Sequence, residues 1–222
     1  MLQRAFFNAI IHAMSCIKRL NAKSLNRHPS ADVVKRILAT ALDAANPADA
    51  VRRELTRTQN LLQVNGQDYP LSDFSAVYLV LVGKAAMSMA EATTDILGND
   101  LTEGIVVSKK DPEKRQNPLA AHPSVLYLEA SHPIPDNQSL FAGRKIFELL
   151  TKTTADDLLI FLISGGGSAL MTVPVDGVSL DDLAKPTFLL FGCGARVNEI
   201  NILRRALDRI KGGGLADAAA LT

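Results

Sequence analysis

Four short segments of this chain are almost entirely apolar. They are residues 77–82 (VYLVLV), 104–107 (GIVV), 125–129 (VLYLE) and 158–163 (LLIFLI). Continuous apolar runs of this length, without alternation, are typical of strands that are covered on both faces of a parallel sheet. The pattern therefore predicts four buried strands.

Segments with helical spacing of apolar residues lie around these runs. The expected helices cover residues 31–45, 48–57, 85–97, 139–152, 180–191 and 199–211. Ser30 and Asn198 are placed to cap the first and the last of them, and Pro186 interrupts the fifth. Residues 61–70 predict an edge hairpin or loop around Asn65-Gly66, and residues 109–124 predict a loop.

Strands that alternate with helices indicate βαβ units with right-handed crossovers. We therefore expect an α/β fold, a three-layer Rossmann-like domain with a mostly parallel sheet and helices on both faces, over residues 31–222. In such a sheet the carboxyl ends of the strands share one edge, where ligands bind.

Composition narrows the function classes. The chain has 24 Lys and Arg against 23 Asp and Glu, a net charge of +1, which gives no electrostatic case for binding nucleic acid or a membrane surface. No apolar run approaches the roughly 20 residues that span a bilayer. Cys16 and Cys193 lie far apart, so we expect neither a disulfide nor a cysteine-ligated zinc site, and a reducing compartment, the cytoplasm, fits.

Residues 1–30 form a basic N-terminal extension that contains five Lys and Arg and no Asp or Glu. Two interpretations fit. One is an amphipathic transit peptide, which would direct the protein to mitochondria. The other, which we favour, is a basic N-terminal helix or a start codon assigned too far upstream.

A glycine-rich loop follows the fourth predicted strand directly, and it contains Ser164, Gly165, Gly166, Gly167 and Ser168. Bare backbone N–H groups at the carboxyl end of a buried strand suit phosphate or another anion. A tight turn explains the glycines equally well. The loop is neither GxxxxGK[ST] nor GxGxxG.

Lys84 follows the first predicted strand after Gly83, and we expect it in the first turn of the next helix. A lysine is unfavourable at the positive end of a helix dipole unless an anion binds there. The alternative is an exposed lysine that extends into solvent. Because Lys84 and the glycine loop both follow parallel strands, we expect them to converge at one edge of the sheet.

His132 and Asp136 lie in a proline-stiffened loop after the third strand. They suit a general base or a residue that orients a hydroxyl group, but a rigid turn in which Asp136 caps the next helix fits equally well. On the last predicted helix, Asn201, Arg204, Asp208 and Lys211 share a polar face. Spacing alone identifies that face only as solvated.

Four motifs, taken together and in order, resemble the N-terminal part of the class II glycerate kinases, whose C-terminal domain is called MOFRL. They are residues 82–86 (VGKAA), 132–136 (HPIPD), 156–170 (DDLLIFLISGGGSAL) and 198–216 (NEINILRRALDRIKGGGLA). The resemblance implies a two-domain enzyme that uses ATP and Mg²⁺ to phosphorylate D-glycerate, normally at the 2-hydroxyl.

The resemblance also implies roles for individual residues. Lys84 becomes the catalytic lysine, and residues 164–168 become the ligand loop. Asn201, Arg204 and Lys211 gain weight as binding residues because they belong to a matching motif. No residue of this chain is implied as a metal ligand.

The chain departs from the family in length, because the segments after residue 216 and the whole second domain are absent. We therefore expect a truncated or split enzyme that needs its missing C-terminal domain or a second copy of itself. The alternative is a non-catalytic α/β module that binds a phosphorylated metabolite or a nucleotide.

Overall fold

A computed structural model describes residue 20, residues 22–111 and residues 118–220. The chain divides into two compact units, residues 1–50 and residues 51–222. The first contains α2 (Lys23–Asn26), α3 (Ala31–Ala44) and the start of α4 (Pro47–Glu54). Most of the basic extension, Cys16 included, lies outside the described residues, so the domain boundary at residue 31 stays a prediction.

α3 and α4 agree with the helices predicted over residues 31–45 and 48–57, apart from their ends. The Ser30 side chain makes no capping hydrogen bond to α3, and the Ser30 amide instead donates to Nδ1 of His28, 3.1 Å away. Ser30 is therefore the N-cap residue, as predicted, but its side chain does not form the expected capping bond. α4 ends at Glu54, three residues before the predicted end, because the chain there enters a strand.

A small antiparallel sheet contains the predicted hairpin. Its strands are β1 (Leu55–Thr58), β2 (Leu61–Val64) and β3 (Gln67–Pro70), in that order. Asn65 and Gly66 both have positive φ angles, as a two-residue hairpin turn requires. The hairpin is confirmed, but β1 was missed because residues 55–57 were assigned to a helix. A short 3₁₀ turn, η1 (Leu71–Asp73), leads on to the main sheet.

The main sheet has four parallel strands in the order β6-β5-β4-β7. Their bounds are β4 (Val77–Val82), β5 (Leu101–Lys109), β6 (Val125–Ala130) and β7 (Leu158–Ile163). All four predicted strands are confirmed, and two match residue for residue. β5 is longer than its apolar core of residues 104–107.

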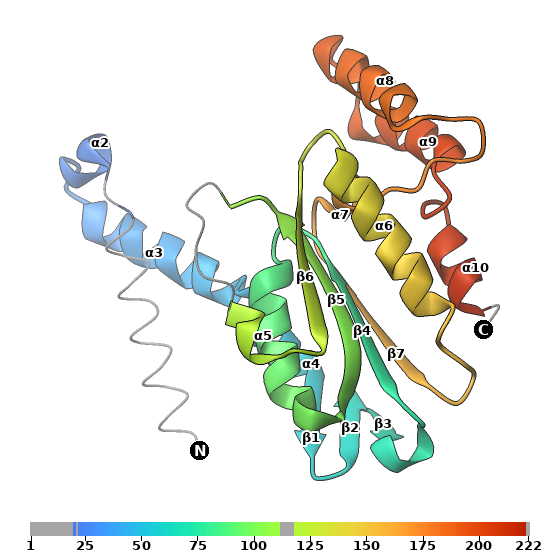
Figure 1. The fold of residues 1–222 in the computed structure, drawn as a ribbon. Coiled ribbons are helices and arrows are strands. Elements are labelled where there is room, and N and C mark those ends of the chain that lie inside the picture. The colour runs from blue at the N-terminus through green and yellow to red at the C-terminus, as the bar shows by residue number, and fades with distance from the viewer. Residues whose placement is uncertain (1–19, 21, 112–117, 221–222) are drawn as a thin grey trace. The chain divides into compact units, whose positions relative to one another are not determined.

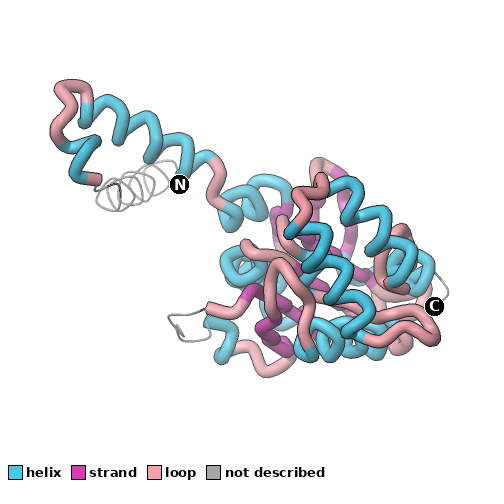
Figure 2. The backbone as a smooth tube through the Cα atoms, turned by 90° about the horizontal axis from the view of Figure 1, so that it is seen from above, coloured by secondary structure: helices cyan, strands magenta, loops and turns pink. Residues whose placement is uncertain are grey.

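Helices cover both faces of this sheet (Figures 1 and 2). α5 (Ala86–Leu97) packs on one face, and α6 (Asn137–Leu150) packs on the other with α10 (Gly214–Ala220) beside it. Alternate side chains of β4 point to opposite faces of the sheet. Val80 and Val82 pack with Ile146 of α6 in one buried cluster. The three-layer α/β arrangement is confirmed. The remaining short elements are η2 (Gly98–Asp100) and η3 (Pro118–Ala121).

Burial is uneven across the sheet. Every residue of β4 is buried, whereas β7 is only half-buried and Ile163 at its end is 60% exposed. The expectation of two covered faces therefore holds for β4 and is wrong for β7. The reason is position, since β7 pairs only with β4 among the strands that the structure describes.

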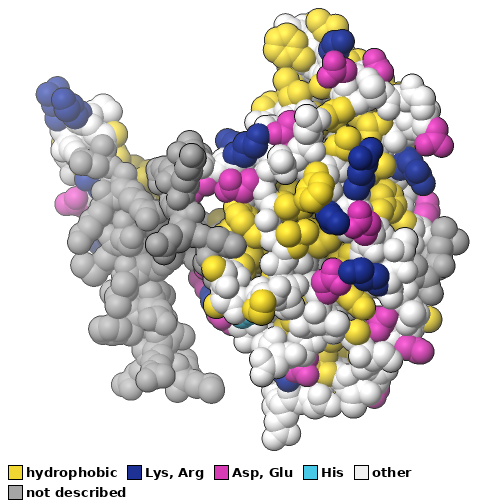
Figure 3. Space-filling model, viewed as in Figure 1, with side chains coloured by type: hydrophobic (Ala, Val, Ile, Leu, Met, Phe, Trp, Pro, Cys, Tyr) yellow, Lys and Arg dark blue, Asp and Glu magenta, His cyan; other side chains and the backbone are white. Residues whose placement is uncertain are grey.

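The C-terminal helices are α7 (Gly167–Leu170), α8 (Leu180–Gly192) and α9 (Val197–Leu207). α8 continues through Pro186 and packs against α9, and hydrophobic side chains gather over this pair (Figure 3). The exposed ones are Phe188, Leu189, Phe191, Val197 and Ile202. None of the described helices is long and apolar enough to cross a membrane.

α9 differs from its prediction at both ends. Its N-cap is Arg196 rather than Asn198, because the Glu199 side chain accepts a hydrogen bond from the Arg196 amide at 2.7 Å. The helix ends at Leu207 rather than Lys211, because Asp208 adopts an extended conformation and pairs with Pro174. Tertiary bonds to Asp208 therefore end the helix.

Close packing of α6 yields a stability prediction. A Cβ at Gly143 would lie 2.5 Å from the Thr172 carbonyl oxygen and 2.8 Å from Ile210, whereas a Cβ at Gly192 of α8 would meet nothing within 4 Å. We expect Gly143→Ala to lower the free energy of unfolding by about 1–3 kcal/mol through overpacking. Gly192→Ala should leave it unchanged or raise it by up to about 1 kcal/mol. Urea denaturation of both variants tests this, and equal effects would contradict the packing argument.

Candidate functional site

The carboxyl ends of all four parallel strands bring candidate groups to one edge. In sheet order, His132 follows β6, Lys109 ends β5, Lys84 follows β4 and the glycine loop follows β7. β4 and β7 pair in register up to Val82 and Ile163, so the Lys84 turn lies directly beside the loop. The predicted convergence of Lys84 and the glycine loop is confirmed.

Hydrogen bonds join the Lys84 turn to the loop. The Ala85 amide donates to Ser164 Oγ at 3.1 Å, and the Lys84 amide donates to the Gly165 carbonyl oxygen at 3.0 Å. Gly83 makes this approach possible, since its φ is 141° and a Cβ there would clash with the side chain and carbonyl of Ser164. Both turns thus form one rigid unit.

Lys84 precedes the helix instead of lying within its first turn. Ala85 is the N-cap of α5, and the bond from the Lys84 amide to Gly165 holds Lys84 outside the helix. Its side chain is exposed and reaches Gly166, where a Cβ would lie 3.0 Å from Lys84 Cε and 3.1 Å from His132 Cδ2. Gly166, with a φ of 96°, therefore lets the lysine and the imidazole meet over the loop.

Positive charge surrounds His132. Burial lowers the pKa of its imidazole first, and the charges of Lys84, Lys109 and Arg204 lower it further. Neither Lys84 nor Lys109 forms an ion pair with any residue that the structure describes. A group of cations without acidic partners creates a positive potential that favours an anion at this edge.

Backbone N–H groups of the glycine loop add hydrogen-bond donors to this positively charged edge. Within the described part of the chain, the amides of Gly165 and Gly166 donate no hydrogen bond. The side chain of Ser168 is half-buried and Gly167 is buried within α7. α7 has only four residues and ends before Met171, where the chain becomes extended. The loop amides and the lysines, rather than a helix dipole, therefore provide the attraction.

Asp136 caps α6. Its carboxylate accepts hydrogen bonds from the Ser139 amide at 3.0 Å, from Ser131 Oγ at 2.7 Å and from Lys110 Nζ at 2.6 Å. Burial raises the pKa of Asp136, but these donors outweigh burial and hold it far below its usual range. The structure favours the cap over the general base, because so weakly basic a carboxylate accepts protons poorly.

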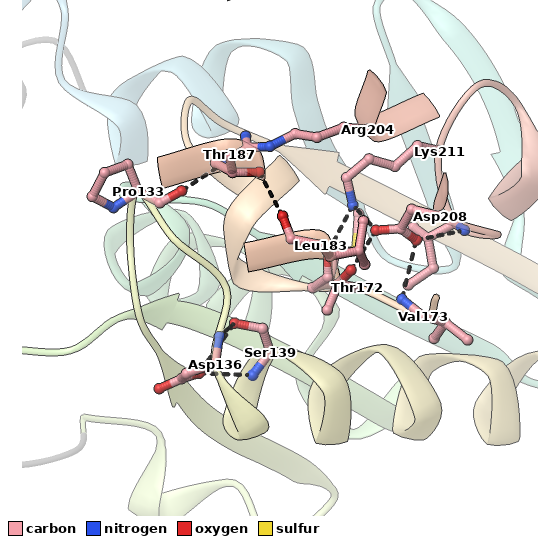
Figure 4. Close-up of polar contacts among 12 residues, drawn as sticks. Pro133, Asp136, Ser139, Thr172, Val173, Leu183, Thr187, Arg204, Asp208 and Lys211 are labelled. Carbon is pink, nitrogen blue, oxygen red and sulfur yellow. Dashed lines mark hydrogen bonds and ion pairs between the residues drawn. The ribbon is translucent and has the colours of Figure 1, made fainter. Parts of the chain in front are cut away.

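The polar face predicted on the last helix is divided between two environments (Figure 4). Arg204 lies on the site side, and its guanidinium donates to the Pro133 carbonyl oxygen at 2.8 Å, next to His132. Burial lowers the pKa of Arg204, and the nearby charge of Asp208 opposes this. Asn201 lies one turn earlier and half-buried, and its side chain makes no hydrogen bond to the described residues.

Lys211 lies on the interior side. Its Nζ donates to Asp208 Oδ2 at 2.6 Å and to the Met171 carbonyl oxygen at 3.0 Å, and its side chain is only 10% exposed. Because α9 ends at Leu207, Lys211 does not lie on the helix that carries Arg204, although the charge of Arg204 still lowers the pKa of Lys211. The prediction of one shared polar face is therefore wrong.

Comparison with known proteins places this arrangement in a family. Residues 33–222 match a family model described as "Domain of unknown function (DUF4147)". The chain belongs to this family. It is 36% identical over 181 residues to "Glycerate 2-kinase" of Pyrococcus horikoshii, which covers 82% of this chain and 39% of that protein. It is 36% identical over 197 residues to human "Glycerate kinase", which covers 85% and 38%.

Two crystal structures of DUF4147 relatives share the fold. The PH0495 protein from Pyrococcus horikoshii aligns with a TM-score of 0.71 at 35% identity, over 84% of this chain and 41% of that one. Glycerate kinase from Thermotoga maritima aligns with a TM-score of 0.65 at 34% identity, over 82% and 40%. The resemblance to the N-terminal part of the glycerate kinases is confirmed, and the chain spans about 39% of the length of the curated relatives.

Sequence reasoning missed two residues of this DUF4147 site. Lys109 was assigned to a loop, although it ends the parallel strand β5. Its place just after an apolar run, like that of Lys84, is the signal that could have identified it. Asp208 was placed on a solvated helix face, whereas it is 3% exposed and bonds to four other residues. No local pattern distinguishes such a buried aspartate from a surface one.

The low pKa of Asp136 makes stability depend on pH. A carboxyl whose pKa falls on folding stabilises the folded state above its unfolded pKa of about 3.9, and that stability is lost as pH falls further. We expect Asp136→Asn to cost about 1 kcal/mol at pH 7, since asparagine retains the cap but not the charge. The difference should narrow below about pH 4. Urea titrations at several pH values test this, with exposed Asp181→Asn as the control.

Proposed function

We propose that this chain carries the N-terminal part of the active site of a glycerate kinase, which transfers a phosphoryl group from ATP to D-glycerate and yields 2-phosphoglycerate. One observation supports this most directly. Lys84, His132 and Gly166 meet at the sheet edge of a chain that is 36% identical to a glycerate 2-kinase. The proposal includes a cytoplasmic location.

Charge neutralisation is the chemistry that these residues offer. Phosphoryl transfer depends mainly on positioning and on stabilising the charge of the phosphoryl oxygens. In this proposal Lys84 is the catalytic cation at the transferred group, and Lys109 and Arg204 neutralise the neighbouring phosphates. The loop of residues 164–168 offers the Gly165 and Gly166 amides as further donors.

His132 suits an orienting role better than proton abstraction. Because burial and three cations lower its pKa, the imidazole is neutral at pH 7 and is a weak base. A neutral imidazole still accepts a hydrogen bond from a hydroxyl group and donates one to an oxygen. We propose that it orients glycerate, whereas Asp136 acts only by fixing the loop that carries His132.

The described residues do not suit a magnesium ion. No group of three His, Cys, Asp or Glu side chains among them can hold a metal, and the groups at the sheet edge are cations. A Mg²⁺ ion bound with ATP would take its protein ligands from other residues. A C-terminal domain or a second copy of this chain would supply them, and no step is assigned here to the metal.

Binding of ATP tests the anion site in the chain itself. We expect isothermal titration to detect saturable binding, and Lys84→Ala to weaken it about tenfold, because one charge-assisted contact is lost. Lys152→Ala is the matched control, since Lys152 pairs with Glu103 at 2.7 Å in an exposed ion pair elsewhere. Equal affinity of the wild type and Lys84→Ala would contradict the role of Lys84.

Catalysis needs a separate test. In a chimera, residues 31–222 replace the matching part of the Pyrococcus horikoshii relative, and a coupled assay measures phosphorylation of glycerate. We expect Lys84→Ala to lower kcat at least 100-fold, or about 2.7 kcal/mol. Full activity of that variant would remove Lys84 from the chemistry. ATP binding without turnover in a folded chimera would favour the alternative, a non-catalytic module that binds phosphorylated ligands.

A further inference from the structure

We infer that Asp208 and Lys211 form a buried frame that positions Arg204 and the His132 loop, and that Lys211 does not contact the ligand. The inference deepens the proposed function by assigning positioning residues to the same site, and it rests on that function only for the identity of the ligand. Its central claim concerns the ligand-free protein.

Asp208 is the centre of the frame (Figure 4). Its carboxylate accepts hydrogen bonds from Thr172 Oγ1, from the Val173 amide at 3.0 Å, from the Ile210 amide at 3.1 Å and from Lys211 Nζ at 2.6 Å. The Asp208 side chain is 2% exposed and that of Lys211 is 10% exposed. Burying a carboxylate this deeply costs free energy that hydrogen bonds and an ion pair such as these offset.

The frame holds the exit of the glycine loop. Lys211 binds the Met171 carbonyl oxygen, and Asp208 binds the next two residues, Thr172 and Val173. Two backbone bonds run alongside, from Arg209 to Val173 at 2.8 Å and from Val175 to Leu207 at 3.0 Å. The segment after α7 is therefore fixed to the end of α9.

The same frame reaches the His132 loop by two routes. The Thr172 amide donates to the Ser139 carbonyl oxygen at 3.0 Å, and Ser139 belongs to the cap that Asp136 forms on α6. Four residues before Asp208 on the chain, Arg204 donates to the Pro133 carbonyl oxygen. The loop that carries His132 is therefore connected to the frame at two points, through Ser139 and through Pro133.

Lys211 makes its contacts in the protein interior, unlike the cations at the sheet edge. Its Nζ already contacts Asp208 and Met171 in the interior, and burial lowers its pKa while the charge of Asp208 opposes this. The charges that act on His132 are those of Lys84, Lys109 and Arg204, and Lys211 is not among them. We therefore expect Lys211 to affect His132 through the position of Arg204 and the loop.

Histidine titration by NMR measures that position directly. The chain contains four histidines, and His132→Gln assigns the signal of His132. In Asp208→Ala/Lys211→Met, which leaves the net charge unchanged, the end of α9 that carries Arg204 loses the side-chain bonds that fix it to residues 171–173. We expect the His132 pKa to rise toward the ordinary value of a free imidazole, because a nearby positive charge withdraws. Thr172→Val should shift it in the same direction by less.

Two further variants serve as references. Asp208→Asn keeps one oxygen for the Val173 and Ile210 amides but loses the acceptor for Thr172 and Lys211, so it should raise the His132 pKa by less than the double variant does. The Lys145–Glu148 pair on α6 has the same i, i+3 spacing at 2.5 Å but is exposed, so Lys145→Met/Glu148→Gln should not change that pKa. Urea denaturation confirms that each variant is folded. If Asp208→Ala/Lys211→Met does not fold, Thr172→Val decides the question.

Each outcome decides the inference. A rise of the His132 pKa in the frame variants, absent from the Lys145/Glu148 control, supports it. An unchanged His132 pKa in a folded frame variant overturns it. It is also overturned if Lys211→Met weakens binding of inorganic phosphate while the ligand-free His132 pKa stays constant, since that pattern identifies a ligand contact. If the His132 pKa shifts in the frame variants but the wild-type chain binds no ATP, the inference about the frame is supported and the proposed function is contradicted.

Discussion

The parallel pairing of β4 with β7 is the constraint on which the site depends. It places the turn after Val82 beside the loop after Ile163, and two hydrogen bonds from the amides of Lys84 and Ala85 then join them. The approach is so close that only a residue without a side chain fits at position 83. Lys84 is therefore placed by backbone geometry, before any side-chain contact contributes.

Sheet order extends this constraint to the other candidate groups. Because β5 and β6 continue the same parallel sheet, Lys109 and His132 reach the edge that holds Lys84. The resulting cations repel one another and, together with burial, lower the pKa of His132. Such repulsion destabilises the folded chain, and an anion that binds there relieves it. Under the proposed function, an anionic ligand accounts for the positive edge, because the cations alone do not stabilise the fold.

The sequence predicted the parts of this fold that depend on local pattern. The runs that became β4 and β7 were located to the residue, since few segments other than buried strands are so uniformly apolar. Prediction failed where contacts between residues distant in the sequence determine where a helix ends. α9 ends four residues early because Asp208 leaves the helix to accept bonds from Thr172 and Val173. At the helix starts, Ser30 occupies the N-cap of α3 without a side-chain capping bond, and Arg196, with the Glu199 side chain bonded to its amide, takes the N-cap of α9 in place of Asn198.

The same distinction explains which site residues could be found. Lys84 and the glycine loop carry a strand-end signal, and Lys109 carries it too, although it was overlooked. Lys211 carries only helical spacing, which placed it with Arg204 on one face. In the structure Arg204 bonds to the His132 loop, whereas Lys211 bonds to the buried Asp208 and to the Met171 carbonyl oxygen. A motif can therefore contain charged residues of two kinds, some that face a ligand and some that hold the others in place, and only burial and hydrogen-bond partners distinguish them.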